Sequence, residues 1–162
     1  MKDKLTVGGL CSGVGGIEKG FQSAGFDISW ANDMDKYAMI TYEKIMKQNH
    51  YVGKTAMHIE SILGNKTYLD ELNPVDVLVS GFPCQAFSVA GYRKGFNDER
   101  GNVFFKIKDI ISHLGKKKFP KALFLENVKN FKSHDNHRTY TRVRNELSNL
   151  GYSVYTKILN TA

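Results

Sequence analysis

The residue best suited to carry out chemistry in this sequence is Cys84, in the segment 81–88, which reads Gly-Phe-Pro-Cys-Gln-Ala-Phe-Ser. The apolar run 75–80 before it is typical of a buried parallel strand. A cysteine at the carboxyl end of such a strand lies where open α/β sheets hold their active sites. Free cysteines are often inert core residues, but the polar Gln85 and Ser88 favour a solvent-facing loop. We therefore expect Cys84 to act as a nucleophile.

A glycine turn and an acidic residue suggest a ligand site near the amino terminus. The turn 12–16, Ser-Gly-Val-Gly-Gly, follows a predicted strand and lets the backbone approach a ligand closely. Glu18 stands where the dinucleotide fingerprint needs a third glycine, which argues against a nicotinamide oxidoreductase. Asp33, at the end of the next predicted strand, could accept hydrogen bonds from both ribose hydroxyls. Glu126 ends a later strand and could protonate a ring nitrogen, or be a buried structural glutamate.

Strand and helix patterns alternate along the whole chain, which predicts an α/β fold. Asp35 is a candidate N-cap, and Gly25 is a candidate C′ residue of the helix before it. The loop 81–102 is longer than compact domains usually carry, so we expect it to be functional. The predicted strands are 5–11, 26–31, 55–59, 75–80, 121–126 and 152–159, and the predicted helices are 17–24, 35–48, 67–72, 103–114 and 138–150.

The composition of the chain limits the class of protein, the cellular compartment and the partners that fit this chemistry. The chain has 162 residues, 41% of them hydrophobic and 24% charged, as in an ordinary soluble domain. Its apolar runs are too short to cross a bilayer, and we predict no membrane association. Two cysteines and no signal peptide favour a reducing, cytoplasmic setting. The five histidines show no metal-ligand spacing with the cysteines, so we predict no metal. The net charge of +7 favours a polyanionic partner.

Four segments together resemble the C5-cytosine-specific DNA methyltransferase family. Leu10–Gly16 resembles its cofactor loop, Asn32–Ala38 its ribose-binding stretch, Pro83–Gln85 its nucleophile loop, and Leu125–Val128 its glutamate motif. They occur in the family's order and spacing over nearly the whole chain. The resemblance implies a doubly wound, mostly parallel, Rossmann-like sheet that uses S-adenosylmethionine. We expect one catalytic domain over 1–162, with a cofactor-binding part at about 1–80 and a catalytic part at about 81–162.

The resemblance also implies roles for individual residues. Cys84 would add to C6 of a cytosine flipped out of double-stranded DNA, and Glu126 would contact its N3 and exocyclic amine. The residues implied to bind the cofactor are Cys11, Ser12, Gly13, Gly15, Gly16, Asp33, Met34, His58, Ile59, Gly81 and Pro83. Those implied to bind DNA are Gln85, Ser88, Arg93, Lys94 and Arg100, and further candidate phosphate contacts are Lys129, Lys132, Arg138, Arg142 and Arg144.

Three cofactor positions depart from the family pattern. Gly9 stands where an acidic residue is frequent, and Cys11 stands where phenylalanine packs on the methionine moiety. His58 replaces the aspartate that accepts the adenine amine. A neutral imidazole nitrogen could still accept that hydrogen bond, but a protonated one could not. We hypothesise that these changes weaken cofactor affinity.

The largest departure is length, because the family continues beyond this point with a Gln-x-Arg-x-Arg segment, a target-recognition domain and a closing helix. The sheet should then be incomplete at its carboxyl-terminal edge, leaving 121–126 as an open edge and 152–159 without a neighbour. We expect the isolated chain not to methylate DNA. It is either a subunit completed by a second chain, in a prokaryotic or phage-host cell, or a truncated product. Two alternative functions remain: an RNA cytosine methyltransferase, and a catalytically inactive nucleic-acid-binding module.

Overall fold

The computed structural model describes residues 4–47, 50–83, 103–115 and 118–160. These residues form two compact units, each described here by itself. The first unit comprises Met1–Phe82 and Phe105–Glu126, and the second comprises Pro83–Phe104 and Asn127–Ala162.

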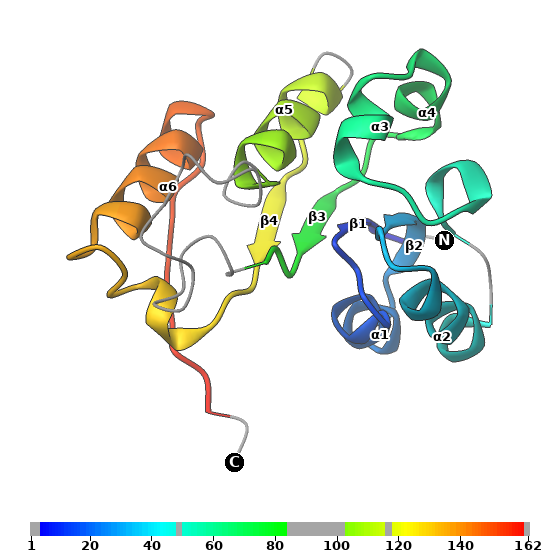
Figure 1. The fold of residues 1–162 in the computed structure, drawn as a ribbon, viewed down its shortest axis with the longest axis horizontal. Helices are drawn as coiled ribbons and strands as arrows, with labels where there is room; N and C mark the ends of the chain where they lie inside the picture. The colour runs from blue at the N-terminus through cyan, green and yellow to red at the C-terminus, as the bar shows by residue number, and fades with distance from the viewer. Residues whose placement is uncertain (1–3, 48–49, 84–102, 116–117, 161–162) are drawn as a thin grey trace. The chain divides into compact units, whose positions relative to one another are not determined.

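The first unit is built on a sheet of four parallel strands in the order β2-β1-β3-β4. Helices cover both faces of this sheet, with α1 and α2 on one side and α3, α4 and α5 on the other (Figure 1). This arrangement confirms the predicted doubly wound α/β fold. The strands are β1 (Thr6–Leu10), β2 (Asp27–Asn32), β3 (Val77–Ser80) and β4 (Ala122–Leu125); the helices are α1 (Gly16–Ser23), α2 (Lys36–Met46), α3 (Ile59–Leu63), α4 (Lys66–Glu71) and α5 (Val103–Gly115), with a short 3-10 helix η1 (Val52–Lys54).

Local sequence signals set the ends of the first two helices as predicted. The Asp35 carboxylate accepts hydrogen bonds from the backbone N–H groups of Tyr37 and Ala38, which caps α2. Gly25 follows α1 with φ of 91°, the left-handed conformation that ends a helix at C′. The end of α1 and the start of α2 therefore each follow from a single residue.

The core follows the period of two along each strand. Val7, Val77 and Val79 pack with Tyr42 and Met46 of α2 into one buried cluster. The apolar stripe of α5 is also buried, with Ile107, Ile110, Ile111 and Leu114 at 0% exposure. No helix among the described residues is long and apolar enough to span a bilayer.

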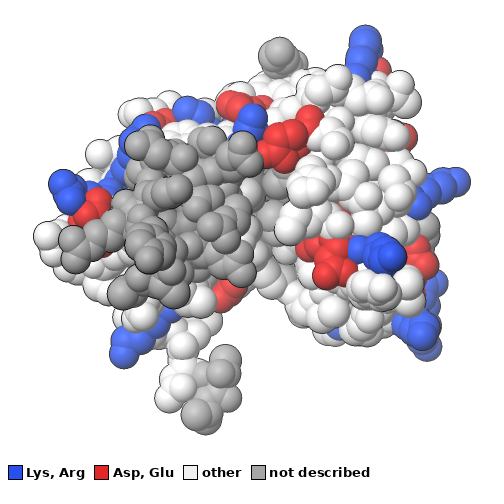
Figure 2. Space-filling model, in the orientation of Figure 1, with Lys and Arg blue, Asp and Glu red and all other residues white. Residues whose placement is uncertain are grey.

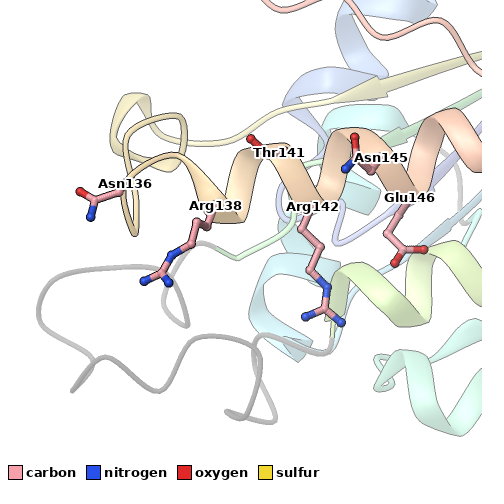
Figure 3. A pocket seen from close by; sticks show the side chains of 6 residues that line it. All are labelled: Asn136, Arg138, Thr141, Arg142, Asn145 and Glu146. Carbon is pink, nitrogen blue, oxygen red and sulfur yellow. The ribbon is translucent and has the colours of Figure 1, made fainter.

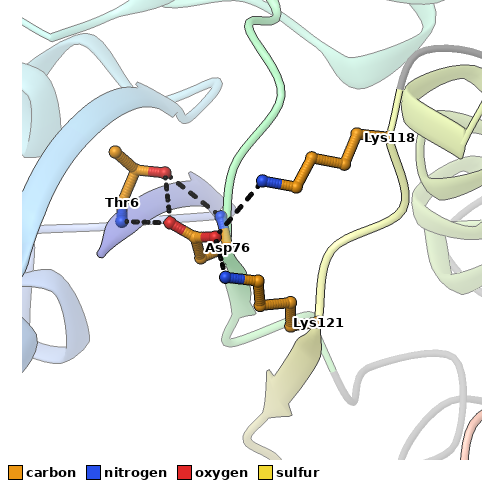
Figure 4. A network of polar contacts seen from close by, with 4 residues as sticks. All are labelled: Thr6, Asp76, Lys118 and Lys121. Carbon is orange, nitrogen blue, oxygen red and sulfur yellow. Dashed lines mark hydrogen bonds and ion pairs between the residues drawn. The ribbon is translucent and has the colours of Figure 1, made fainter. Parts of the chain in front are cut away.

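Asp76 joins three strands at their amino-terminal ends (Figure 4). Its Oδ2 accepts hydrogen bonds from the Thr6 backbone N–H at 2.9 Å and from the Thr6 hydroxyl at 3.2 Å. Its Oδ1 lies 2.8 Å from Lys121 Nζ and 3.5 Å from Lys118 Nζ. Because Thr6 starts β1, while Asp76 and Lys121 directly precede β3 and β4, one carboxylate fixes the start of all three strands.

Two predicted strands are wrong. Residues 55–58 form no strand, and Ile59 instead begins α3. Within the described parts of the chain, only an isolated bridge between Ala31 and Tyr51 continues the sheet next to β2. The segment 152–159 forms no strand either, and its Tyr155 is 90% exposed. Alternation indicates a strand only where a neighbour can pair with it. The open edge is confirmed, because β4 pairs only with β3 among the described residues.

The second unit contains α6 (Arg138–Asn149) and a short 3-10 helix, η4 (Lys129–Phe131). Gly151, with φ of 95°, follows the end of α6, close to its predicted end. The Tyr140 hydroxyl lies 2.7 Å from Thr156 Oγ1, which holds the segment after the helix against it.

Candidate functional site

The glycine turn after β1 is held in a sharply bent shape. Cys11, Gly13 and Gly15 all have positive φ, at 52°, 53° and 84°. A side chain at Gly15 would meet the Tyr42 ring, since an added Cβ would lie 2.7 Å from it. An added Cβ at Gly13 would meet nothing within 4 Å, so there the turn is open to a ligand.

Asp33 fixes this turn to the end of β2. Its Oδ2 accepts a hydrogen bond from the Gly13 N–H at 2.7 Å, and its Oδ1 accepts one from the Asp35 N–H at 2.9 Å. Each carboxylate oxygen keeps a second acceptor site. The neighbouring Met34 side chain is 66% exposed, as a residue that packs against an outside ligand would be.

The segment before α3 lies beside the same strand end. The Met57 N–H donates to the Asp33 carbonyl at 2.9 Å, and the Asn32 side-chain amide donates to the Met57 carbonyl at 2.8 Å. These bonds bring His58 next to Asp33, although the two are far apart in sequence. His58 is exposed and its side chain makes no capping hydrogen bond, whereas Ile59 is 6% exposed.

The carboxyl ends of β3 and β4 approach the turn from the other side. The Glu126 N–H donates to the Ser80 carbonyl at 2.9 Å, which extends the strand pairing to that residue. A Cβ added to Gly81 would lie 3.5 Å from Glu126 Oε2 and 3.9 Å from the Cys11 carbonyl oxygen. Glu126 is exposed, so it is not a buried structural glutamate.

The electrostatics of the turn favour a cation. Burial raises the pKa of the Cys11 thiol to about 12, and the nearby Asp33 carboxylate adds to this effect. The thiol is therefore neutral at ordinary pH. Burial also raises the pKa of Glu18, which lies at the start of α1. A phosphate would be repelled by the Asp33 and Glu18 carboxylates, while a positively charged ligand would relieve both.

An unpartnered polar atom marks the same place. Glu18 Oε2 is buried and has no hydrogen-bond partner among the described residues, whereas Ser12 hydrogen-bonds the Glu18 side chain and Ser80 hydrogen-bonds Cys11 closely enough to lower the pKa of each. Such groups usually indicate a missing partner. The open turn and this orphaned acceptor fit S-adenosylmethionine, which carries an ammonium group, a sulfonium and ribose hydroxyls.

Several predicted residues lie outside the described part of the chain: Cys84, Gln85, Ser88, Arg93, Lys94 and Arg100. Pro83 is described and belongs to the second unit. The sequence analysis missed Glu18 and Tyr51 as parts of the site. The Tyr51 hydroxyl donates to the Gly13 carbonyl at 3.3 Å, a contact between distant residues that no local spacing indicates.

The basic residues after β4 belong to the second unit. An open pocket of about 370 Å³ on α6 is lined in part by Arg138 and Arg142, which project from the same side of the helix (Figure 3). Arg138 is also paired with Asp135 at 2.5 Å. On the face drawn in Figure 2, the described Lys and Arg side chains stand in separate groups, with acidic side chains beside several of them. Phosphate binding by these residues stays a prediction.

The described residues contain no group of three His, Cys, Asp or Glu side chains that could hold a metal ion. An open apolar groove of about 500 Å³ runs between α1 and the free edge of the sheet, lined by residues that include Ile17, Phe21 and Phe124. Phe124, on the edge strand β4, is 44% exposed although its ring packs edge-to-face on Phe21.

A parallel sheet with a glycine turn after its first strand and an acid after its second is the doubly wound arrangement of Rossmann-like folds, and solved methyltransferase structures have this fold. The chain belongs to the C-5 cytosine-specific DNA methylase family, whose model matches residues 5–162.

Curated relatives extend this result. The chain is 42% identical over 158 residues to the type II methyltransferase M.Bsp6I of Bacillus sp. (strain RFL6), covering 96% of this chain and 46% of that protein. It is 40% identical over 164 residues to the type II methyltransferase M.HhaI of Haemophilus parahaemolyticus, covering 99% of this chain and 46% of that protein. The chain therefore spans about half the length of these relatives.

Solved structures show the same fold. The S. pombe Dnmt2 methyltransferase matches with a TM-score of 0.62 and 25% identity, covering 93% of this chain and 42% of that one. The Entamoeba histolytica methyltransferase EhMeth matches with a TM-score of 0.63 and 23% identity, covering 92% of this chain and 45% of that one.

Proposed function

We propose that this chain is the catalytic part of a DNA (cytosine-5)-methyltransferase, which moves a methyl group from S-adenosylmethionine to C5 of cytosine in double-stranded DNA. The observation that carries this proposal is the meeting of the glycine turn, Gly81 and Glu126 at the carboxyl ends of β1, β3 and β4. Cys84 is three residues beyond Gly81 in the sequence, and three residues span at most about 11 Å. The proposed nucleophile thus follows this meeting point closely in the sequence.

Each proposed residue has one task in the reaction. The Cys84 thiolate forms a bond to C6 of cytosine, and the ring electrons that this displaces allow C5 to form a bond to the methyl carbon. The bond between that carbon and the donor sulfur breaks at the same time, and its electron pair stays on the sulfur, so that S-adenosylhomocysteine leaves. Glu126 hydrogen-bonds N3 and thereby stabilises the negative charge that develops on the ring. Loss of the C5 proton then breaks the C6–S bond, and the electron pair returns to sulfur. The target base must first leave the helix, because its C6 is covered within a duplex.

The cofactor site is proposed around the glycine turn. When bound there, S-adenosylmethionine supplies an electrophilic methyl group. Asp33 would accept hydrogen bonds from the ribose hydroxyls through its remaining acceptor sites, and Met34 would pack on the adenine. His58 would accept a hydrogen bond from the adenine amine.

We also propose that a completing polypeptide, equivalent to the half of the relatives that this chain does not match, covers the free edge of β4 and the groove beside it. The relatives' length supports this occupant, since the chain spans only 46% of either protein. The edge supports it too, because unpaired strand backbone and an exposed Phe124 are an aggregation hazard unless they are covered.

Hydroxyl-radical footprinting tests this completion. The chain would be compared with a fusion that joins it to the part of the Bacillus relative that it does not match. We expect Phe124 to be oxidised in the chain alone and protected in the fusion. Leu5 has the same 44% exposure but lies away from the groove, so its oxidation should not change. Equal oxidation of Phe124 in both proteins would contradict the completion.

Covalent trapping on the same fusion tests the function. With S-adenosylmethionine and a duplex containing 5-fluorocytosine at the target site of the Bacillus relative, we expect a denaturation-resistant protein–DNA adduct. The Cys84→Ser variant should form none, and Glu126→Gln should form it more slowly. If the Bacillus protein itself forms the adduct and the folded fusion does not, the proposal is wrong. Tritium transfer to transfer RNA in place of DNA would favour the RNA methyltransferase, and binding without an adduct would favour the inactive module.

A further inference from the structure

Glu18 is a buried carboxylate that the proposed reaction does not use. It lies in the first turn of α1 with only 1% of its surface exposed. Its Oε2 has no hydrogen-bond partner, and no Lys, Arg or His among the described residues pairs with it. Burial disfavours the charged form of such a group and raises its pKa, against the smaller effect of a hydrogen bond from Ser12. Such a group calls for a partner.

The position of this carboxylate explains Gly9. A Cβ added to Gly9 in β1 would overlap Glu18 Oε1, and it would lie 2.6 Å from Ser12 Oγ. The helix carboxylate therefore occupies the space into which a side chain on the strand would project. Ser12 hydrogen-bonds the carboxylate closely enough to lower its pKa, so one acceptor atom without a partner, Glu18 Oε2, is left beside the glycine turn.

The titratable groups around Glu18 are acidic or neutral. Asp33, at the end of β2, is close enough to raise the pKa of Glu18 by charge repulsion, after the larger effect of burial. Glu18 in turn raises the pKa of Tyr42 on α2 and of Tyr51 before η1, where burial is again the larger cause. Among the described residues, no positive charge faces Glu18 from these elements, and a cation that arrives with a ligand would supply the partner.

We propose that Glu18 is a cofactor-binding residue, and that its carboxylate accepts hydrogen bonds from the α-ammonium group of S-adenosylmethionine. This rests on the proposed function, because it assumes that cofactor. The ammonium is assigned rather than the sulfonium because Oε2 is a free acceptor, and only the ammonium has N–H donors. Glu18 of α1 then takes the place of the acidic residue that β1 lacks at Gly9, because its side chain occupies the space into which a side chain at Gly9 would project.

Calorimetric titration of the purified 162-residue chain tests this assignment. Glu18→Gln keeps the shape of the side chain and removes its charge. We expect it to weaken S-adenosylmethionine binding by about 10- to 100-fold, the usual effect of losing a charged hydrogen bond. The matched ligand is 5′-methylthioadenosine, which lacks the amino-acid part and should bind both proteins equally.

Proton release gives a second readout. Burial raises the pKa of Glu18, whereas a bound ammonium would lower it, so binding should release whatever fraction of a proton this residue carries at the pH of the titration. Titrations in buffers of different ionisation enthalpy measure that release. The three groups facing Glu18, namely Asp33, Tyr42 and Tyr51, are unchanged in Glu18→Gln, so the difference between the two proteins reports Glu18 alone.

Moving the carboxylate from position 18 to position 9 distinguishes a loss of binding from a loss of folding. In Gly9→Asp/Glu18→Ala the strand would place a carboxylate in the vacated space and should recover binding. Gly9→Ala/Glu18→Ala has no carboxylate there and should not. Thermal unfolding checks that each variant is folded.

The outcomes separate this inference from the proposed function. If the folded wild-type chain binds neither S-adenosylmethionine nor 5′-methylthioadenosine, the proposed cofactor site fails and the inference fails with it. If the wild type binds and Glu18→Gln binds S-adenosylmethionine as tightly with the same proton release, only the inference is wrong. It is also wrong if Glu18→Gln loses both ligands alike, since Glu18 would then only support the turn.

Discussion

Replacing Asp76 with asparagine should lower the free energy of unfolding by about 2 kcal/mol. The carboxylate accepts two hydrogen bonds from Thr6, at 2.9 and 3.2 Å, and its side chain is only 12% exposed. Hydrogen bonds to a charged acceptor contribute about 1.5–3 kcal/mol. The ion pair with Lys121 adds less, since that side chain is 61% exposed. Asparagine keeps one carbonyl acceptor for the Thr6 N–H, so only part of this energy is lost.

The stability difference between wild type and Asp76→Asn should depend on pH, and the lowered pKa of Asp76 sets the direction of that dependence. The hydrogen bond with Lys121 and that from the Thr6 backbone hold the pKa of Asp76 well below its usual 3.8. A lowered carboxylate pKa stabilises the fold above the unfolded pKa, and this contribution disappears as pH falls through the folded pKa. The gap between wild type and Asp76→Asn should therefore be constant from about pH 5 to 8 and should narrow below about pH 4.

Urea unfolding followed by circular dichroism measures the loss of unfolding free energy and its pH dependence, and thermal unfolding measures the melting temperature. At about 2–4 °C per kcal/mol for a chain of this size, the melting temperature should fall by about 4–8 °C. The control is Asp27→Asn, which removes a surface pair with Lys4 in which both side chains are at least 60% exposed, and should change stability by less than about 0.5 kcal/mol. If Asp76→Asn changes stability no more than this control, the carboxylate does not hold the three strands together.

Two more predictions concern the glycine turn. In Cys84→Ser the remaining thiol is Cys11, whose pKa is about 12 against the usual 9.0. Its alkylation by iodoacetamide at pH 8 should therefore be about a thousandfold slower than that of free cysteine. Mass spectrometry measures this rate, and a rate near that of free cysteine would refute the burial argument. Gly15→Ala should destabilise the fold by more than about 1 kcal/mol, because φ is 84° and the new Cβ meets the Tyr42 ring. Gly20→Ala, in the middle of α1 with open space around its Cβ, should instead stabilise by about 0.5–1 kcal/mol in the same unfolding assay.

Local signals were sufficient to predict much of the fold. The Asp35 cap and the Gly25 C′ residue set two helix ends within a residue or two of their observed positions. The buried strands were identified because apolar runs before turns have few other structures open to them. These are features that a few neighbouring residues determine among themselves.

Features that depend on distant partners were harder to predict. The alternating segment 152–159 has the composition of a strand, yet strand formation needs a neighbour that is absent from the described residues. Residues 55–58 are held beside β2 by the bond from the Met57 N–H to the Asp33 carbonyl rather than by a ladder. Tyr51 and Gly13 are brought together only by the fold.

The candidate site shows why substitutions should be judged by the space they occupy rather than by their position in a motif. Compared position by position with the family, Gly9 is a missing acid and Cys11 a missing aromatic ring. In three dimensions the space beside Gly9 already contains the Glu18 carboxylate, and the raised pKa of Cys11 keeps it a small neutral side chain. His58 differs from Gly9, because it is exposed and its side chain makes no capping hydrogen bond. The hypothesis of weakened cofactor affinity therefore applies least to Gly9, and it stays a prediction for Cys11 and His58.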